Sequence, residues 1–183
     1  AGNYAALLGR IGRIPEAEAA QGKAITAARR LATAYPGDTV VARLELGALM
    51  NMASIQARIV GREVEVVAAF EACAEKASVL ADSEPLLTDV QLQAADIHLS
   101  LAVTRLTIGR NSEALVAIDR AIQIQEKLFE STKDEQTTYF LGRIYGVKAQ
   151  TLKNLNQIGE AREYFRKAND LLKPLALDNG SLD

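Results

Sequence analysis

Few residues of this chain of 183 carry side chains that support catalysis or metal binding. His98 is the only histidine and Cys73 the only cysteine. One imidazole cannot build a histidine-based metal site within a single chain, and the sequence offers Cys73 no evident base to activate its thiol. We therefore predict that His98 is a partly buried structural residue and Cys73 a buried inert thiol, and that the chain has no catalytic residues, no metal and no cofactor.

Other chemical patterns are incomplete. Gly22-Lys23 resembles the end of a phosphate-binding loop, but Ala17 stands where the first glycine belongs and Ala24 replaces the serine or threonine. The formal net charge of −2 lacks the basic footprint of a nucleic-acid binder. No stretch approaches about eighteen uncharged apolar residues, which predicts no membrane insertion.

The composition favours helices. The sequence holds 31 alanines and 23 leucines against 12 glycines and 4 prolines, and alanine and leucine lose little entropy in a helix. With 49% hydrophobic residues and a small net charge, the chain is expected to fold as a soluble, all-α protein. A single cysteine excludes an intramolecular disulfide, so cysteine content leaves the cellular compartment open.

A repeat organises the chain. Gly12, Gly61 and Gly109 each sit between a branched apolar residue and an arginine, at spacings of 49 and 48 residues, and Asn156 continues the series 47 residues later. Asparagine is the next best residue after glycine in the left-handed conformation that ends helices, so the fourth turn keeps the same backbone geometry. The spacing predicts four repeats of about 48 residues.

Between these turns, apolar residues recur every three or four positions, which predicts helices. Pro15 suits a helix start, and Thr88 or Asp89, Ser112 and Asp134 are candidate helix caps. We expect eight helices, over residues 2–12, 15–35, 39–60, 63–82, 87–109, 112–131, 135–156 and 158–176. They form antiparallel pairs within one domain (1–183), at residues 1–36, 37–85, 86–133 and 134–177, followed by a tail at 178–183.

These residues resemble the tetratricopeptide (TPR) repeat family over nearly the whole chain. The family's second helix carries a small residue, a large one four positions later and a small one three beyond that. The matches are Val66-Phe70-Cys73, Ala114-Ile118-Ala121, Ala161-Phe165-Ala168 and, more weakly, Ala17-Gln21-Ala24. The period exceeds the usual one of about 34 residues, so the chain is similar to long-helix variants. Residues 28–38 resemble repeats that follow bacterial serine/threonine kinases.

The resemblance implies a right-handed superhelical solenoid of about four helix pairs that binds a protein or peptide in its concave groove. The function expected from it is a non-catalytic interaction scaffold. Carried over residue by residue, the family's groove positions are Asn51, Ile55, Arg58, Asp96, Leu99, Val103, Arg143, Gln150 and Lys153. The apolar members of this set have an alternative role, which is packing on neighbouring helices.

A second surface is a possible basic edge. Arg13, Arg62 and Arg110 each follow a turn glycine, so stacked repeats would line them up. They either complement the dipole of the preceding helix or form a docking edge for an acidic partner.

Two alternative functions stay open. The chain is a regulatory or sensory module of a larger bacterial signalling enzyme, such as a serine/threonine kinase, or it is a self-association module. The first follows from Ala1 standing where an initiator methionine is expected, which suggests a fragment or a processed product. The second, a homo-oligomer, follows from apolar residues at the solenoid end, among them Tyr4, Leu7 and Leu8.

Overall fold

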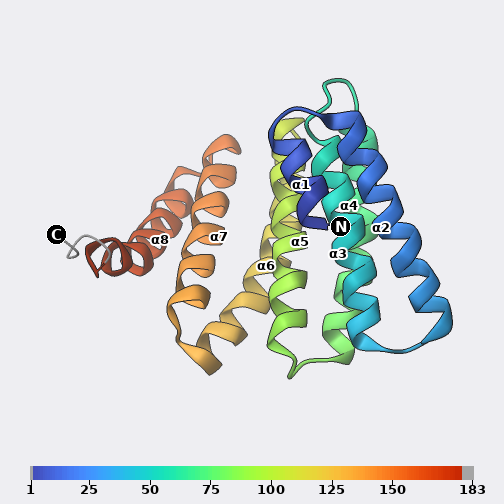
Figure 1. The fold of residues 1–183 in the computed structure, drawn as a ribbon. Coiled ribbons are helices and arrows are strands. Elements are labelled where there is room, and N and C mark those ends of the chain that lie inside the picture. The colour runs from blue at the N-terminus through green and yellow to red at the C-terminus, as the bar shows by residue number, and fades with distance from the viewer. Residues whose placement is uncertain (1, 179–183) are drawn as a thin grey trace. The chain divides into compact units, whose positions relative to one another are not determined.

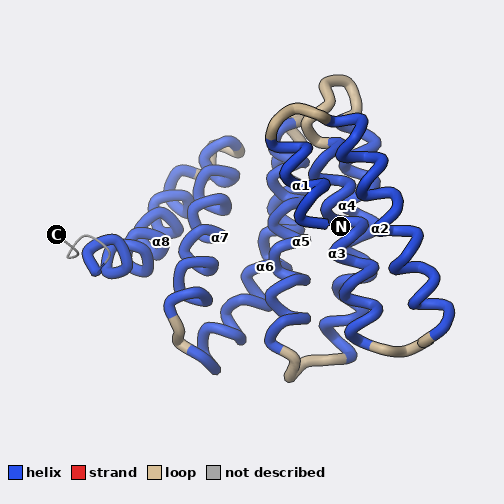
Figure 2. Tube along the Cα trace, in the orientation of Figure 1, coloured by secondary structure: helices blue, strands red, loops and turns tan. Residues whose placement is uncertain are grey.

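The chain folds entirely into α-helices joined by short turns. The structure, a computed structural model, describes residues 2–178, with side chains for 4–176. Over this range it contains eight helices and no strand (Figure 2). The predicted all-α class and the antiparallel helix pairs are confirmed. The expected tail beyond residue 178 and the expectation attached to Ala1 lie outside the described residues.

Two compact units divide the chain at the boundary between the second and third predicted pairs. The N-terminal unit (Ala1–Pro85) has a short first helix that packs on both of the next two, and the third helix packs on the fourth (Figure 1). The single continuous solenoid and its handedness stay predictions. The helices of this unit are α1 (Gly2–Arg10), α2 (Ile14–Ala34), α3 (Thr39–Gln56) and α4 (Glu63–Ser83).

The C-terminal unit (Leu86–Asp183) repeats the pattern with four helices of similar length, each packed on the next. Helix α8 approaches α7 so closely at Gly142 that a Cβ atom there would lie 2.7 Å from Cγ of Leu172. Edge-to-face contact between Tyr145 and Tyr164, with ring centroids 5.6 Å apart, extends this packing. The helices are α5 (Thr88–Thr107), α6 (Asn111–Thr132), α7 (Glu135–Asn154) and α8 (Ile158–Asp178).

The turn residues adopt the predicted left-handed conformation. Gly12, Gly61 and Gly109 have φ angles of 83°, 90° and 77°, and Asn156 has 62°. At Gly109, the next amide donates to the carbonyl of Arg105 (2.9 Å) and the amide of Gly109 to that of Leu106 (3.1 Å). This pair of hydrogen bonds closes the last turn of the helix, and the same pair recurs after α1 and α7. The period therefore comes from a repeated helix ending.

Some predicted helix ends are wrong. Helix α3 stops at Gln56 instead of residue 60, because the amides of Arg58 and Ile59 bond to carbonyls only three residues back and Val60 is 94% exposed. This loop also accounts for the longer first spacing. Asp134 caps α7, with its Oδ1 accepting from the Thr137 amide at 2.7 Å.

The other candidate caps are incorrect. Helix α5 begins at Thr88, with Leu87 as its cap residue, and α6 begins at Asn111, with Arg110 as its cap residue. Thr88, Asp89 and Ser112 therefore lie within their helices and not at the cap positions. Neither Leu87 nor Arg110 makes a side-chain capping hydrogen bond.

Replacing the turn glycine tests whether backbone conformation holds the repeat. We expect Gly109→Ala to lower the free energy of unfolding by about 1–2 kcal/mol, although a Cβ atom there meets nothing within 4 Å. The matched control is Gly146→Ala within α7, where a Cβ also meets nothing and helix propensity predicts a gain of about 0.5–1 kcal/mol. Urea unfolding of both variants measures this, and changes of the same sign would contradict it.

Candidate binding surfaces

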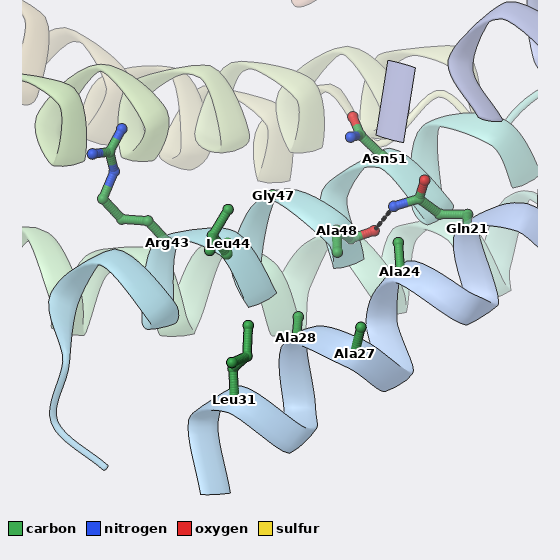
Figure 3. Close-up of a pocket in the computed structure, with 10 residues that line it drawn as sticks. All are labelled: Gln21, Ala24, Ala27, Ala28, Leu31, Arg43, Leu44, Gly47, Ala48 and Asn51. Atoms are coloured by element: carbon green, nitrogen blue, oxygen red, sulfur yellow. Dashed lines mark hydrogen bonds between the residues drawn. The ribbon is translucent and has the colours of Figure 1, made fainter. Parts of the chain in front are cut away.

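Helices α2 and α3 form an apolar trough in the N-terminal unit, and α1 fills one half of it. Ala5 and Leu8 of α1 pack with Ala17 and Ile55 in a buried cluster. Beyond α1, the trough is open as a cavity of about 390 Å³ (Figure 3). Its lining is mostly small and apolar, and consists of Gln21, Ala24, Ala27, Ala28, Leu31, Arg43, Leu44, Gly47, Ala48 and Asn51.

Gln21 joins the two helices at the closed end of this cavity. Its side chain is fully buried, and Nε2 donates to the Ala48 carbonyl at 2.8 Å (Figure 3). Oε1 accepts no hydrogen bond from the described residues. In the repeat pattern Gln21 takes the position that Phe70 and Ile118 fill in later pairs. In the first pair a hydrogen bond to α3 therefore stands in place of a large apolar contact.

The predicted groove residues of the N-terminal unit separate in the structure. Asn51 lines the open cavity. Ile55 is only 4% exposed because α1 covers it, so it belongs to the core. Arg58 lies in the loop after α3, where Nη1 donates to the Gly9 carbonyl at 3.4 Å. Only Asn51 of these three therefore faces an open part of the trough.

In the C-terminal unit, Asp96 and Arg143 come close enough to interact electrostatically. Burial raises the pKa of the Asp96 carboxyl, and the positive charge of Arg143 partly offsets this. The Arg143 guanidinium also lies over the rings of Tyr139 (5.8 Å) and Phe140 (5.3 Å), a stabilising cation–π arrangement. The result is a mixed aromatic and charged surface on α7.

The remaining predicted positions of this unit differ in exposure. Leu99 is 3% exposed and packs in the core, so it presents no surface to a partner. Val103, Gln150 and Lys153 are exposed. The Gln150 amide donates to Asn154 Oδ1 at 2.9 Å on the same helix.

The arginines of the predicted basic edge are paired with acids. Each occupies the N-cap position of α2, α4 or α6, which is the positive end of the helix dipole rather than the negative end that we expected. A glutamate three residues on neutralises each charge, in the pairs Arg13–Glu16, Arg62–Glu65 and Arg110–Glu113. Each of these three turns therefore carries an ion pair.

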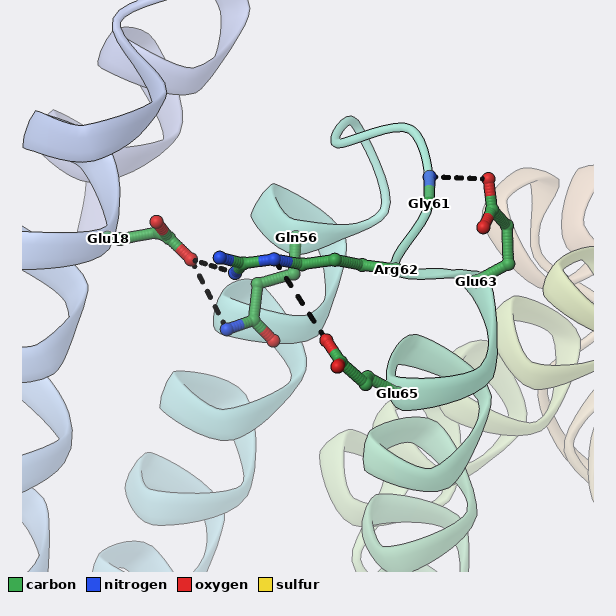
Figure 4. A network of polar contacts seen from close by, with 6 residues as sticks. All are labelled: Glu18, Gln56, Gly61, Arg62, Glu63 and Glu65. Carbon is green, nitrogen blue, oxygen red and sulfur yellow. Dashed lines mark hydrogen bonds and ion pairs between the residues drawn. The ribbon is translucent and has the colours of Figure 1, made fainter.

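Arg62 does more than the other two, because it also reaches α2. Its Nη1 lies 3.1 Å from Glu18 Oε1, which also accepts from Gln56 Nε2 at 3.3 Å (Figure 4). Beside it, the Gly61 amide donates to Glu63 Oε1 at 3.0 Å and lowers the pKa of that carboxyl. This network ties the turn after α3 to the preceding helix pair.

Cys73 and His98, the two side chains considered above for chemistry, are both buried, and His98 is more fully buried than predicted. Cys73 is 3% exposed, and burial raises the pKa of its thiol. His98 is 8% exposed, and burial, with smaller effects from Arg120 and Arg105, lowers its pKa to about 4. Among the described residues, no group of three or more His, Cys, Asp or Glu side chains is placed to hold a metal ion. No helix within residues 2–178 has both the length and the apolar character needed to cross a membrane.

Comparison with known proteins matches residues 142–171 to the tetratricopeptide repeat family. These residues run from within α7 into α8. No curated protein matches the chain in sequence. The matching solved structures include two whose titles are "Crystal structure of MamA" and "Crystal structure of MamA protein".

The first of these structures is 16% identical, over 83% of this chain and 88% of that chain, with a TM-score of 0.36. The second is 15% identical, over 85% and 95%, with a TM-score of 0.35. The match at residues 142–171 confirms the predicted resemblance to TPR repeats there, and the similarity to kinase-associated arrays stays a prediction.

The Arg62 network predicts unequal effects of removing the turn arginines. We expect Arg62→Met to lower the free energy of unfolding by about 0.5–1 kcal/mol, because Glu18 is only 27% exposed and loses its cationic partner. Arg110→Met, which removes an exposed pair, should cost less than about 0.5 kcal/mol. Denaturation in low and high salt compares them, and equal losses would show that the link to α2 adds nothing.

His98 predicts a dependence of stability on pH. The folded pKa of about 4 lies below the ordinary value of 6.5, so between these values the unfolded chain binds a proton that the folded chain does not. Stability therefore falls as the pH drops from 6.5 to 4, by about 3 kcal/mol at most. Comparing the chain with His98→Gln at each pH isolates this effect from that of Asp96. A difference that stays constant between pH 7 and 4 would refute it.

Proposed function

We propose that this chain, in which residues 142–171 match the tetratricopeptide repeat family, is a non-catalytic scaffold that binds a protein partner. The partner presents a helical segment, which lies in the open half of the trough between α2 and α3. The observation that carries the proposal is that α1 already fills the other half of the same trough. The trough therefore accommodates a helix in this chain itself.

The lining suits close packing of a helix. Ala24, Ala28 and Ala48 present no side chain beyond Cβ, so a helix axis can approach to the ordinary packing distance of about 8–10 Å. Leu31 and Leu44, 40% and 54% exposed, line the open part of the cavity and offer apolar contact area. A helix with a face of small and apolar residues complements this surface.

In this proposal, polar residues supply specificity in the trough, and the C-terminal unit, taken by itself, holds further candidate contacts. Asn51 lines the cavity and offers an amide to the partner. In the C-terminal unit, the exposed Arg143 on its aromatic ring pair suits a carboxylate of the partner. Val103, Gln150 and Lys153 stay candidate contacts there, as Arg58 does in the N-terminal unit.

The absence of catalysis is part of the proposal. A catalytic site needs a nucleophile or base that substrate can reach, and His98 and Cys73 are both buried. Their pKa shifts also disfavour the charged forms, since burial lowers the pKa of the imidazole and raises that of the thiol. The paired turn arginines likewise argue against a docking edge for acidic partners.

A photoreactive residue in the trough tests the proposal in cells. With p-benzoylphenylalanine in place of Leu44, we expect covalent adducts to a helical segment of a partner, located by mass spectrometry. Adding Leu31→Glu should reduce the adduct yield about tenfold or more, since it places an unpaired charge in the apolar seat. Val64, 68% exposed on α4, is the control site for the photoreactive residue. Equal yields at 44 and 64, or no effect of Leu31→Glu, would rule out the trough.

A further inference from the structure

Helix α1 carries large apolar side chains on its outer face as well as its inner one. Tyr4 and Leu7 of α1 and Ile11 of the turn that follows it, at positions i, i+3 and i+7, are 58%, 55% and 59% exposed. The opposite face, with Ala5 and Leu8, is buried. Large apolar residues on two faces of one helix favour cover on both faces, so the outer stripe points to an interface.

A shallow cavity of about 410 Å³ lies beside this stripe, between α1 and α2. Ala19 and Ala20 line it together with Tyr4. Glu16 and Lys23, also in its lining, lie on either side of these alanines in sequence. The two charged residues are seven positions apart on α2, which is two turns, or roughly 10.5 Å. The face therefore combines apolar contact area with opposite charges on either side of a small-residue centre.

We propose that this face, formed by Tyr4, Leu7, Ile11, Glu16 and Lys23 around the two alanines, binds the same face of a second copy of the chain. A two-fold axis through Ala19 and Ala20 lays the two α2 helices antiparallel. Lys23 of each copy then meets Glu16 of the other, where it joins the existing pair of Glu16 with Arg13. A parallel arrangement would instead place like charges together, so the charge pattern selects the two-fold dimer.

The first experiment measures mass against concentration. The chain has a mass of 19.7 kDa, and sedimentation equilibrium between about 1 and 200 μM should show the mean mass rise toward twice this value. Leu7→Glu should weaken association at least tenfold. Val116 lies on α6 and is 69% exposed, and the control variant Val116→Glu should leave association unchanged. A single-chain mass at every concentration overturns the proposal, as does a dimer that Leu7→Glu leaves intact.

A charge exchange tests the geometry without depending on one variant. Lys23→Glu and Glu16→Lys each place like charges opposite one another in a homodimer, so each alone should associate at least tenfold more weakly. Mixed together, one copy carries two glutamates and the other two lysines, and the heterodimer should recover wild-type affinity. A mixture that associates no better than the separate variants overturns the two-fold arrangement.

This dimer is independent of the proposed trough. Circular dichroism checks that each variant is folded, and the adducts formed from position 44 should persist in Leu7→Glu. A wild-type chain that forms these adducts but stays a single-chain species refutes the dimer alone, and a chain that dimerises without forming them refutes the trough alone.

Discussion

A helix pair forms only if the chain reverses direction within a few residues, and in this protein a left-handed residue makes that reversal possible. At Gly12, Gly109 and Asn156 the backbone turns through positive φ, and the following amide reaches back to close the end of the first helix. Each first helix can then bury its apolar face against the helix that follows. The packing of both units depends on these turns, because single helices of this length are marginal in water.

Within each unit, a second polar contact joins one helix pair to the next. Gln21 of α2 donates to the Ala48 carbonyl of α3, and Gln125 of α6 donates to the Thr137 carbonyl of α7 at 3.1 Å. Both glutamines are fully buried. A buried amide that lost this acceptor would be left unsatisfied at a substantial free-energy cost, so each bond fixes the rotation of the second helix relative to the following first helix. The turns thus bring the two helices of a pair together, and the buried amides fix how α2 meets α3 and how α6 meets α7.

The helices were predictable because the apolar period and the turn residues report directly on local structure. The end of α3 was not, since a loop from Arg58 to Val60 can be distinguished from helix only by its hydrogen bonds. The cap positions failed for a related reason. Helix α6 begins at Asn111, one residue earlier than expected, which places Ser112 inside its first turn, and Thr88 is itself the first residue of α5.

The binding surface was less accessible from sequence. Groove positions taken from the family placed Ile55 and Leu99 toward a partner, but both are buried. Gln21 was visible only as a weak match, because its acceptor lies 27 residues away in sequence. The pairing of the turn arginines did have a signal, since a glutamate follows each one at the third position. That spacing places opposite charges on neighbouring turns of a helix.

Helix α1 connects the two proposed surfaces. With nine residues it is too short to be stable alone, so its helicity depends on contacts with its neighbours. Its inner residues Ala5 and Leu8 close one half of the trough, and its outer residues would lie in the dimer. In the proposed dimer, the second copy covers the outer face and holds α1 against α2 and α3. An ordered α1 then forms one end of the open half of the trough.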